Sequence, residues 1–287
     1  MTIELKNLKN TVYRDGDGHT VPLVLVHAFP VDHRMWDDCA AEIIRQSDEA
    51  GLPQFAIWAP DMPGAGDAPV VSDAESGGRA ADGAYEHALD LLADAYVDVL
   101  HAAGYERAVW AGLSMGGYVI LDIQRRHPDA VAGFAMCDTK GDADTREQRA
   151  NRVHVAEQCE NERSVDPVMH FADANPSDSS FKQSAAGKAL FTRWILDQKP
   201  EGIAWRQRMA AGRPDLNDQL PLISAPAAVI CGDKDPFADE SRMRTIASAM
   251  TNTHVAYTLI NDCGHFSAVE HPAQVATALT ALMGRAQ

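Results

Sequence analysis

The stretch Val109-Trp-Ala-Gly-Leu-Ser-Met-Gly-Gly-Tyr-Val-Ile120 places Ser114 between an apolar run and an amphipathic helix. A serine hydroxyl is a poor nucleophile at neutral pH, so it needs exposure, a base and nearby N–H donors before it reacts. A sharp turn from strand to helix provides the exposure, and the unpaired N–H groups of the helix start provide the donors. Gly112 and Gly116 lack the side chains that would collide in such a turn. The stretch therefore predicts a nucleophilic Ser114, provided that the rest of the chain supplies its partners.

Length and charge narrow the classes of function. The chain has 287 residues, a net charge of −16 and 46% hydrophobic residues. This length buries a large core and fits one domain with an inserted subdomain. Proteins that bind nucleic acid usually carry a basic patch, and none is visible here, so nucleic acid is not an expected partner. An acidic substrate would meet an unfavourable mean field unless local residues offset it.

Nothing in the sequence predicts a membrane-spanning segment, a metal site or a framework of disulfide bonds. The first ten residues lack the apolar core of a signal peptide, and the apolar run Val21–Val26 is too short to cross a bilayer. The cysteines are odd in number and scattered, which favours a reducing compartment; they are Cys39, Cys137, Cys159, Cys231 and Cys263. We expect a cytoplasmic protein without cofactor or metal, and the oligomeric state stays open.

Apolar runs alternate with helical periodicity along most of the chain. Expected helices include Met35–Gln46 and Tyr85–Ala103. Eight strands are expected, at Thr2–Leu5, Thr11–Arg14, Val21–His27, Phe55–Ala59, Arg107–Ala111, Val131–Cys137, Ala227–Cys231 and Val255–Ile260. This alternation predicts an α/β fold, with a mostly parallel eight-stranded sheet and helices on both faces. Ligands of such sheets bind at the carboxyl ends of the strands.

The alternation stops in the middle of the chain. Residues 138–221 contain helical segments only, at Ala143–Asn161, Asp166–Ala172, Ser184–Asp197 and Ile203–Ala211. We expect this segment to form a helical cap over a core made of residues 1–137 and 222–287. Large apolar side chains of the cap, together with Phe266, are candidates either for lining a substrate pocket or for holding the cap together; those of the cap are Met169, Phe171, Phe191, Trp194 and Trp205.

A base for Ser114 should be a histidine in a loop at the same end of the sheet. His265 follows the last predicted strand, and Gly264 allows the sharp turn that presents its ring. An acid must fix the tautomer of the imidazole. Asp235 follows the Ala227–Cys231 strand and is the first candidate, while Asp138 and Asp233 remain alternatives.

An oxyanion hole needs two N–H groups. The backbone N–H of Met115, directly after the nucleophile, is expected to supply one of them. The loop His27-Ala-Phe-Pro30 follows a buried strand, and the backbone N–H of Phe29 is the candidate for the other.

These motifs together resemble those of the α/β-hydrolase superfamily across nearly the whole chain. His27-Ala-Phe-Pro30 resembles the oxyanion loop of that family, although Ala28 stands where the family usually has glycine. The other matching motifs are the turn Asp61-Met-Pro-Gly-Ala-Gly66, the nucleophile turn Gly112–Gly116, the acid loop Gly232–Asp235 and the base at Gly264-His265. Phe29–Trp36 and Asp138–Thr145 are most similar to esterases related to 3-oxoadipate enol-lactonases.

The resemblance implies a cofactor-free serine carboxylesterase that cleaves small esters through an acyl-enzyme. Short acyl groups are expected because the cap is compact and the sequence shows no large apolar surface for a lipid interface. An enzyme that opens an enol-lactone or cleaves a carbon–carbon bond would use the same residues, because the fold does not decide among these chemistries. A receptor that only binds a ligand in the pocket is a third hypothesis. The intact set of Ser114, Asp235 and His265 argues against the receptor.

Overall fold

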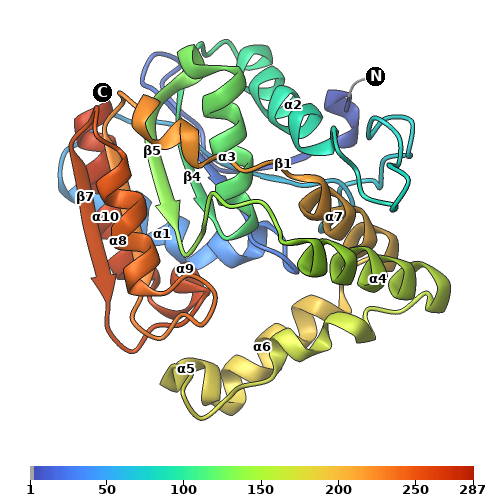
Figure 1. The fold of residues 1–287 in the computed structure, drawn as a ribbon. Helices are drawn as coiled ribbons and strands as arrows, with labels where there is room; N and C mark the ends of the chain where they lie inside the picture. Colours follow the sequence, from blue (N-terminus) through green and yellow to red (C-terminus); the bar gives the residue numbers. More distant parts are fainter. Residues whose placement is uncertain (1–2) are drawn as a thin grey trace.

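A single sheet forms the centre of the computed structural model, which describes residues 3–287 (Figure 1). The sheet contains seven strands: β1 (Lys9–Arg14), β2 (Leu23–Val26), β3 (Ile57–Asp61), β4 (Ala108–Leu113), β5 (Val131–Cys137), β6 (Ala227–Gly232) and β7 (Val255–Ile260). Their order is β1-β3-β2-β4-β5-β6-β7. Only β1 runs antiparallel to its neighbour, β3, and the other pairs within the described residues are parallel.

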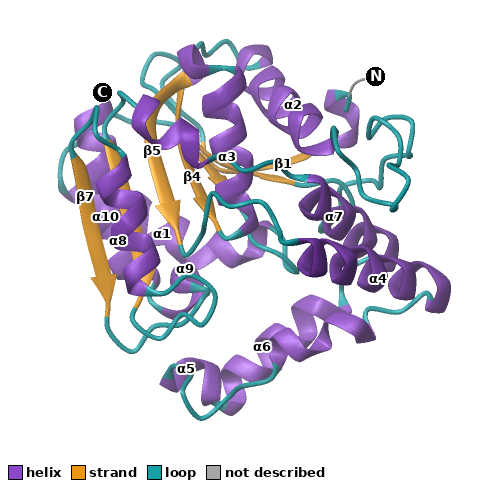
Figure 2. Cartoon of the chain, in the orientation of Figure 1, coloured by secondary structure: helices purple, strands orange, loops and turns teal. Residues whose placement is uncertain are grey.

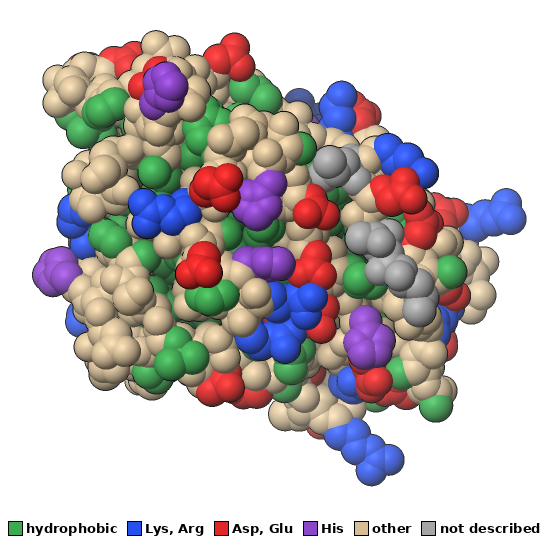
Figure 3. All heavy atoms as spheres, turned by 90° about the horizontal axis from the view of Figure 1, so that it is seen from above, with side chains coloured by type: hydrophobic (Ala, Val, Ile, Leu, Met, Phe, Trp, Pro, Cys, Tyr) green, Lys and Arg blue, Asp and Glu red, His purple; other side chains and the backbone are tan. Residues whose placement is uncertain are grey.

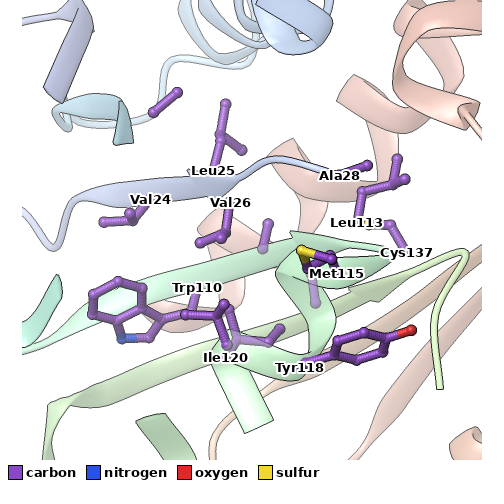
Figure 4. Close-up of a cluster of buried hydrophobic side chains, with 14 of the residues drawn as sticks. Val24, Leu25, Val26, Ala28, Trp110, Leu113, Met115, Tyr118, Ile120 and Cys137 are labelled. Atoms are coloured by element: carbon purple, nitrogen blue, oxygen red, sulfur yellow. The ribbon is translucent and has the colours of Figure 1, made fainter. Parts of the chain in front are cut away.

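How deeply each strand is buried follows from its place in the sheet. Every residue of β2, β4, β5 and β6 is buried, as expected for parallel strands covered on both faces. The edge strands β1 and β7 are mostly half-buried. In Figure 4, Val24 and Val26 point to one face of β2 and Leu25 points to the other. Trp110 of β4 is fully buried, and in Figure 4 its ring lies beside Ile120 of the helix that follows β4.

Helices cover both faces of the sheet (Figure 2). Helix α1 packs against α10, and α2 packs against α3. The helices and 3-10 turns outside the middle of the chain are η1 (Leu5–Asn7), η2 (His33–Trp36), α1 (Asp37–Glu49), α2 (Ala88–Ala102), α3 (Met115–Arg126), η3 (Pro128–Ala130), α8 (Glu240–Ala249), α9 (Ser267–Glu270) and α10 (Pro272–Ala286).

The segment between β5 and β6 is helical throughout its regular structure. It contains α4 (Arg146–Glu162), η4 (Asp166–Ala172), α5 (Ser180–Gln183), α6 (Ala185–Leu196), α7 (Pro200–Gly212) and η5 (Asn217–Leu222). Thr145 and Gln148 begin α4 with a reciprocal capping box. Helix α4 packs against α7, and Figure 1 shows both at the end of the molecule toward which the strand arrows point.

The predicted fold class is confirmed, but the sheet has seven strands and not eight. Of the expected strand Thr2–Leu5, Thr2 lies outside the described residues, and Leu5 begins η1. The local turn is favoured because the N–H of Asn7 donates to the carbonyl of Glu4 at 2.8 Å, and the Asn7 side chain donates to Glu75. Four residues are too few for alternation alone to distinguish a strand from such a turn.

The surface carries both signs of charge. Figure 3 shows the end of the molecule opposite α5 and α6, where acidic and basic side chains are interspersed. Within residues 3–287, no helix combines the length and apolar character that crossing a membrane requires.

Candidate active site

Ser114 lies at a tight turn between β4 and α3. Its backbone has φ 54° and ψ −112°, which is uncommon for a residue other than glycine. A Cβ atom at Gly112 would collide with the backbone of Gly116, and one at Gly116 would collide with the carbonyl of Val26. The two glycines therefore allow the close approach of strand and helix that leaves the Ser114 side chain partly exposed.

The structure brings Ser114, His265 and Asp235 together from three loops at the carboxyl ends of β4, β7 and β6. Nε2 of His265 lies 2.8 Å from Oγ of Ser114. Nδ1 of His265 lies 3.0 and 2.9 Å from the two carboxylate oxygens of Asp235. The Asp235 carboxylate also accepts the N–H of Phe237 at 2.8 Å, which fixes its orientation. With Nδ1 protonated, Nε2 can accept the proton of the serine hydroxyl.

The two alternative acids make other contacts. Asp233 is exposed, and its carboxylate accepts the N–H of Cys263, so it stabilises the loop that carries His265. Asp138 is fully buried and accepts the N–H of Gly232 through Oδ1. Its Oδ2 has no hydrogen-bond partner among the described residues. Burial, followed by the charge of Asp235, raises the pKa of Asp138 well above its ordinary value.

Two opposing effects set the basicity of His265. Burial lowers the pKa of the imidazole, but the charge and hydrogen bond of Asp235 act in the other direction, with smaller contributions from Asp138 and Glu270. The net result is a pKa raised above the ordinary value of histidine. The rings of Phe237 and Phe266 contact the imidazole edge-on, with centroids at 4.9 and 5.4 Å.

Glu270 is a residue of the site that the sequence argument missed. Its buried carboxylate accepts the N–H of Gly264 at 2.7 Å and the N–H of Phe266 at 3.1 Å, on either side of His265. It also accepts the hydroxyl of Ser179, which lies in the helical segment between β5 and β6. An acidic residue five positions after the histidine, in the next helical turn, was the available signal.

The two expected oxyanion donors border the same space as Ser114. Phe29 and Met115 both line the cavity that contains Ser114 and His265. Met115 is the first residue of α3, where a backbone N–H has no partner within the helix. Neither the Met115 nor the Phe29 N–H donates a hydrogen bond within residues 3–287. Both N–H groups therefore stay candidates for the oxyanion hole.

Buried polar contacts hold the loop that carries Phe29. His27 places Nδ1 2.9 Å from the carbonyl of Ala28, and its Nε2 accepts the N–H of Met62 at 3.0 Å. These contacts are compatible with a neutral ring, and burial lowers the pKa of His27. The N–H of Ala28 points to the sulfur of Met35 at 3.1 Å. His27 thus shapes the loop and does not contact Ser114.

One group of side chains has the composition of a metal site, formed by Asp32, His33 and Asp61. Its carboxylates already have partners. Arg34 donates to both oxygens of Asp32 at 2.8 Å, and Gln198 donates to Oδ2 at 2.7 Å. His33 contacts Asp61 through its backbone N–H and its ring. Since Arg34 already pairs with Asp32 and His33 already binds Asp61, we assign the group to the structure of the loop.

A cavity of about 330 Å³ opens at Ser114. Its aromatic lining consists of Phe29, Tyr118, Phe171 and Phe237, and Phe171 alone of these was an expected pocket residue. Of the predicted pocket residues, Phe171 lines this cavity, and Phe266 lines an adjoining one of about 130 Å³.

Four of the expected pocket residues lie elsewhere. Phe191 is fully buried and packs on Phe266 with ring centroids at 4.7 Å. Trp194 faces Arg34 and borders a separate cavity. Trp205 is buried and donates to Ser76, and Met169 packs against the core. These four side chains therefore pack against other parts of the protein and do not line the cavity at Ser114. The sequence could not show this, because periodicity identifies an apolar helix face but not the residues it packs against.

Comparisons with known proteins give a consistent picture. A family model described as "Alpha/beta hydrolase family" matches residues 23–278. The AB hydrolase superfamily protein YisY of Bacillus subtilis is 24% identical over 233 residues, which cover 79% of each chain. A thermophilic esterase from Thermogutta terrifontis is 27% identical with a TM-score of 0.80, covering 97% of this chain and 93% of that one. The enol-lactonase from Burkholderia xenovorans LB400 is 21% identical with a TM-score of 0.73 over 96% of both chains, which is a likeness of fold.

Proposed function

The chain belongs to the alpha/beta hydrolase family, and from this premise we propose that it is a serine hydrolase of small carboxylic esters. The observation that carries the proposal is the contact of His265 Nε2 with Ser114 Oγ at 2.8 Å, with Asp235 on the other ring nitrogen. The esterase of Thermogutta terrifontis, similar over nearly its whole length, supports the choice of an ester.

The proposed reaction has two halves. Ser114 attacks the ester carbonyl while His265 takes the hydroxyl proton, and the N–H groups of Phe29 and Met115 stabilise the oxyanion. His265 then gives its proton to the leaving alkoxide, and an acyl-enzyme remains on Ser114. Water, activated by the same histidine, attacks the acyl-enzyme and releases the acid. Asp235 holds the ring and stabilises the imidazolium in both halves.

The size of the cavity supports a small substrate. Its volume of about 330 Å³ lies at the low end of the range for small-molecule sites, about 300 to 1,000 Å³. A short acyl group and a small alcohol fit such a space better than a lipid chain.

The test is covalent labelling of the purified protein with a fluorophosphonate, followed by intact mass and a panel of p-nitrophenyl esters. We expect one label in the wild type and none in Ser114→Ala, whose kcat should fall by about 10⁴- to 10⁶-fold. Ser248→Ala removes an exposed serine of α8 and serves as the matched control. Folded protein that takes up no label would contradict the proposal and favour a receptor. Turnover of an enol-lactone or a vinylogous diketone without any ester turnover would favour the other hydrolases.

A further inference from the structure

The cavity at Ser114 is lined by two kinds of side chain. The aromatic residues Phe29, Phe171 and Phe237 contact one another in series, with centroids 5.6 and 6.1 Å apart, and Phe237 contacts His265. The remaining polar lining includes three cations, Lys140, Arg152 and Arg242. They come from the loop after β5, from α4 and from α8. A pocket for a purely apolar ester would not need these groups.

The arginines of this lining are neutralised by neighbouring carboxylates. Arg152 donates to Asp144 at 2.5 Å, and the same carboxylate binds Arg213 at 2.7 Å. Arg242 pairs with Asp142. A third carboxylate, that of Asp239, is exposed and accepts the backbone N–H of Arg242. Two carboxylates, those of Asp144 and Asp142, thus form ion pairs with all three guanidinium groups of this region.

Lys140 has no such balance. Its side chain is half-buried in the cavity, yet no carboxylate among the described residues lies within 4.0 Å of its ammonium group, and it makes no hydrogen bond with them. The carboxyl of Asp138 also lines the cavity, but it is fully buried, its Oδ1 accepts the N–H of Gly232, and it forms no ion pair with Lys140. Lys140 therefore leaves one positive charge that the protein does not pair.

The rest of the chain makes this charge significant. With a net charge of −16, the mean field of the protein repels anionic substrates. A single unpaired ammonium in the lining of the cavity at Ser114 opposes that field locally, and in a partly desolvated pocket its effect exceeds that of a surface lysine.

Resting on the proposed function, we propose that the substrate is an anionic ester, in which a second, non-reacting carboxylate binds Lys140. Half-esters of short dicarboxylic acids are the simplest members of this class. The aromatic side chains contact the uncharged part of the substrate, and the ammonium selects the charged end. Lys140 is accordingly a residue that determines specificity and takes no part in the proton transfers.

The test compares two esters of nearly equal shape. Monomethyl succinate carries a carboxylate where methyl 4-oxopentanoate carries a methyl ketone. We expect the wild type to hydrolyse the half-ester with a kcat/KM about tenfold higher or more, a preference that falls as salt is added. Lys140→Met should remove most of this preference and leave kcat/KM for the ketone ester within about twofold. Lys140→Arg should retain it, and Lys9→Met, which removes an exposed charge on β1, should change neither value.

Equal rates of the wild type on both esters would overturn the proposal, as would an equal loss on both in Lys140→Met. A binding measurement separates this outcome from failure of the proposed function. In Ser114→Ala, calorimetric titration with monomethyl succinate should give binding that Lys140→Met weakens about tenfold. Binding that is absent, or that does not depend on Lys140, overturns the anionic substrate even if esters are cleaved. If the titration shows binding that depends on Lys140 but the folded wild type takes up no fluorophosphonate, the result would support anion recognition and contradict the hydrolase.

Discussion

At the scale of single residues, the contact of Asp235 with His265 makes a prediction about pH. The reaction needs a neutral imidazole, which predominates above its pKa, and that pKa is raised mainly by Asp235 against the effect of burial. The acid limb of kcat/KM should therefore have its midpoint above about 6.5, the ordinary value of histidine. Asp235→Asn removes the charge, so its limb should move to lower pH while kcat falls by about 10⁴-fold. Steady-state rates between pH 5 and 9 check both effects, and an unchanged midpoint in the variant would contradict the assignment.

Glu270 carries a second prediction, as a positioning residue. A glutamine offers one acceptor oxygen where the carboxylate offers two, so Glu270→Gln leaves Gly264 or Phe266 without a partner. We expect kcat to fall about tenfold, since an unsatisfied buried N–H costs about 1–3 kcal/mol and the loop of His265 shifts to relieve it. The lost charge should also lower the midpoint of the acid limb. The exposed Glu86→Gln is the control, and a variant with the kinetics of the wild type would show that the clamp is dispensable.

Not every residue of the site was equally predictable. The turn at Ser114 and the loop of His265 could be recognised from the sequence, because each combines glycine with a position directly after an apolar strand. Asp233 and Asp235 differ by two positions, so spacing could not separate them, and only the contact of His265 with Asp235 did. Glu270 had only the signal of an acidic residue five positions after the histidine, and its contacts with Gly264 and Phe266 appear only in three dimensions. Lys140 had no local signal, because its role depends on which neighbours it lacks in the folded chain.

At the scale of elements, one side chain of α7 connects that helix to the loop of Phe29. The fully buried Arg206 donates to the carbonyl of Val31 at 2.7 Å, to Gly202 at 3.1 Å and to Gln198 at 2.8 Å. Burial lowers the pKa of Arg206 to about 10, yet it stays charged at neutral pH.

Arg206→Met should therefore lower the free energy of unfolding by about 2–4 kcal/mol, because buried acceptors lose their donors. Denaturant unfolding followed by circular dichroism measures this loss. Arg193→Met, an exposed arginine of α6, should change stability by no more than about 0.5 kcal/mol. Equal stabilities of the two variants would show that Arg206 contributes nothing to the loop.

Among the elements, buried strands were the most predictable. β2, β4, β5 and β6 are continuous apolar runs because both faces are covered, and that pattern is local to each strand. The expected strand at Thr2–Leu5 was wrong in its described part because a turn of η1 satisfies the backbone there. The partners of α6 were not predictable, since an amphipathic face does not specify what it packs against.

At the scale of the whole molecule, burial couples the helical segment 138–221 to the sheet. Ile203, Trp205 and Arg206 of α7 are fully buried, and Ser179 binds Glu270 beside His265. We expect one unfolding transition, with tryptophan fluorescence, which includes Trp205, and far-ultraviolet circular dichroism giving the same midpoint. Two separated transitions would instead identify residues 138–221 as a unit that unfolds on its own.

The backbone of Ser114 has a wider consequence. A positive φ at a residue with a side chain is destabilising by about 1–3 kcal/mol, and glycine there would remove that penalty. Glycine would also remove the hydroxyl, so the sturdier protein would be an inert one. Selection for turnover and selection for thermal robustness thus oppose each other at this single position. A screen for thermal stability alone would favour glycine at position 114, and it would thereby select a protein without activity.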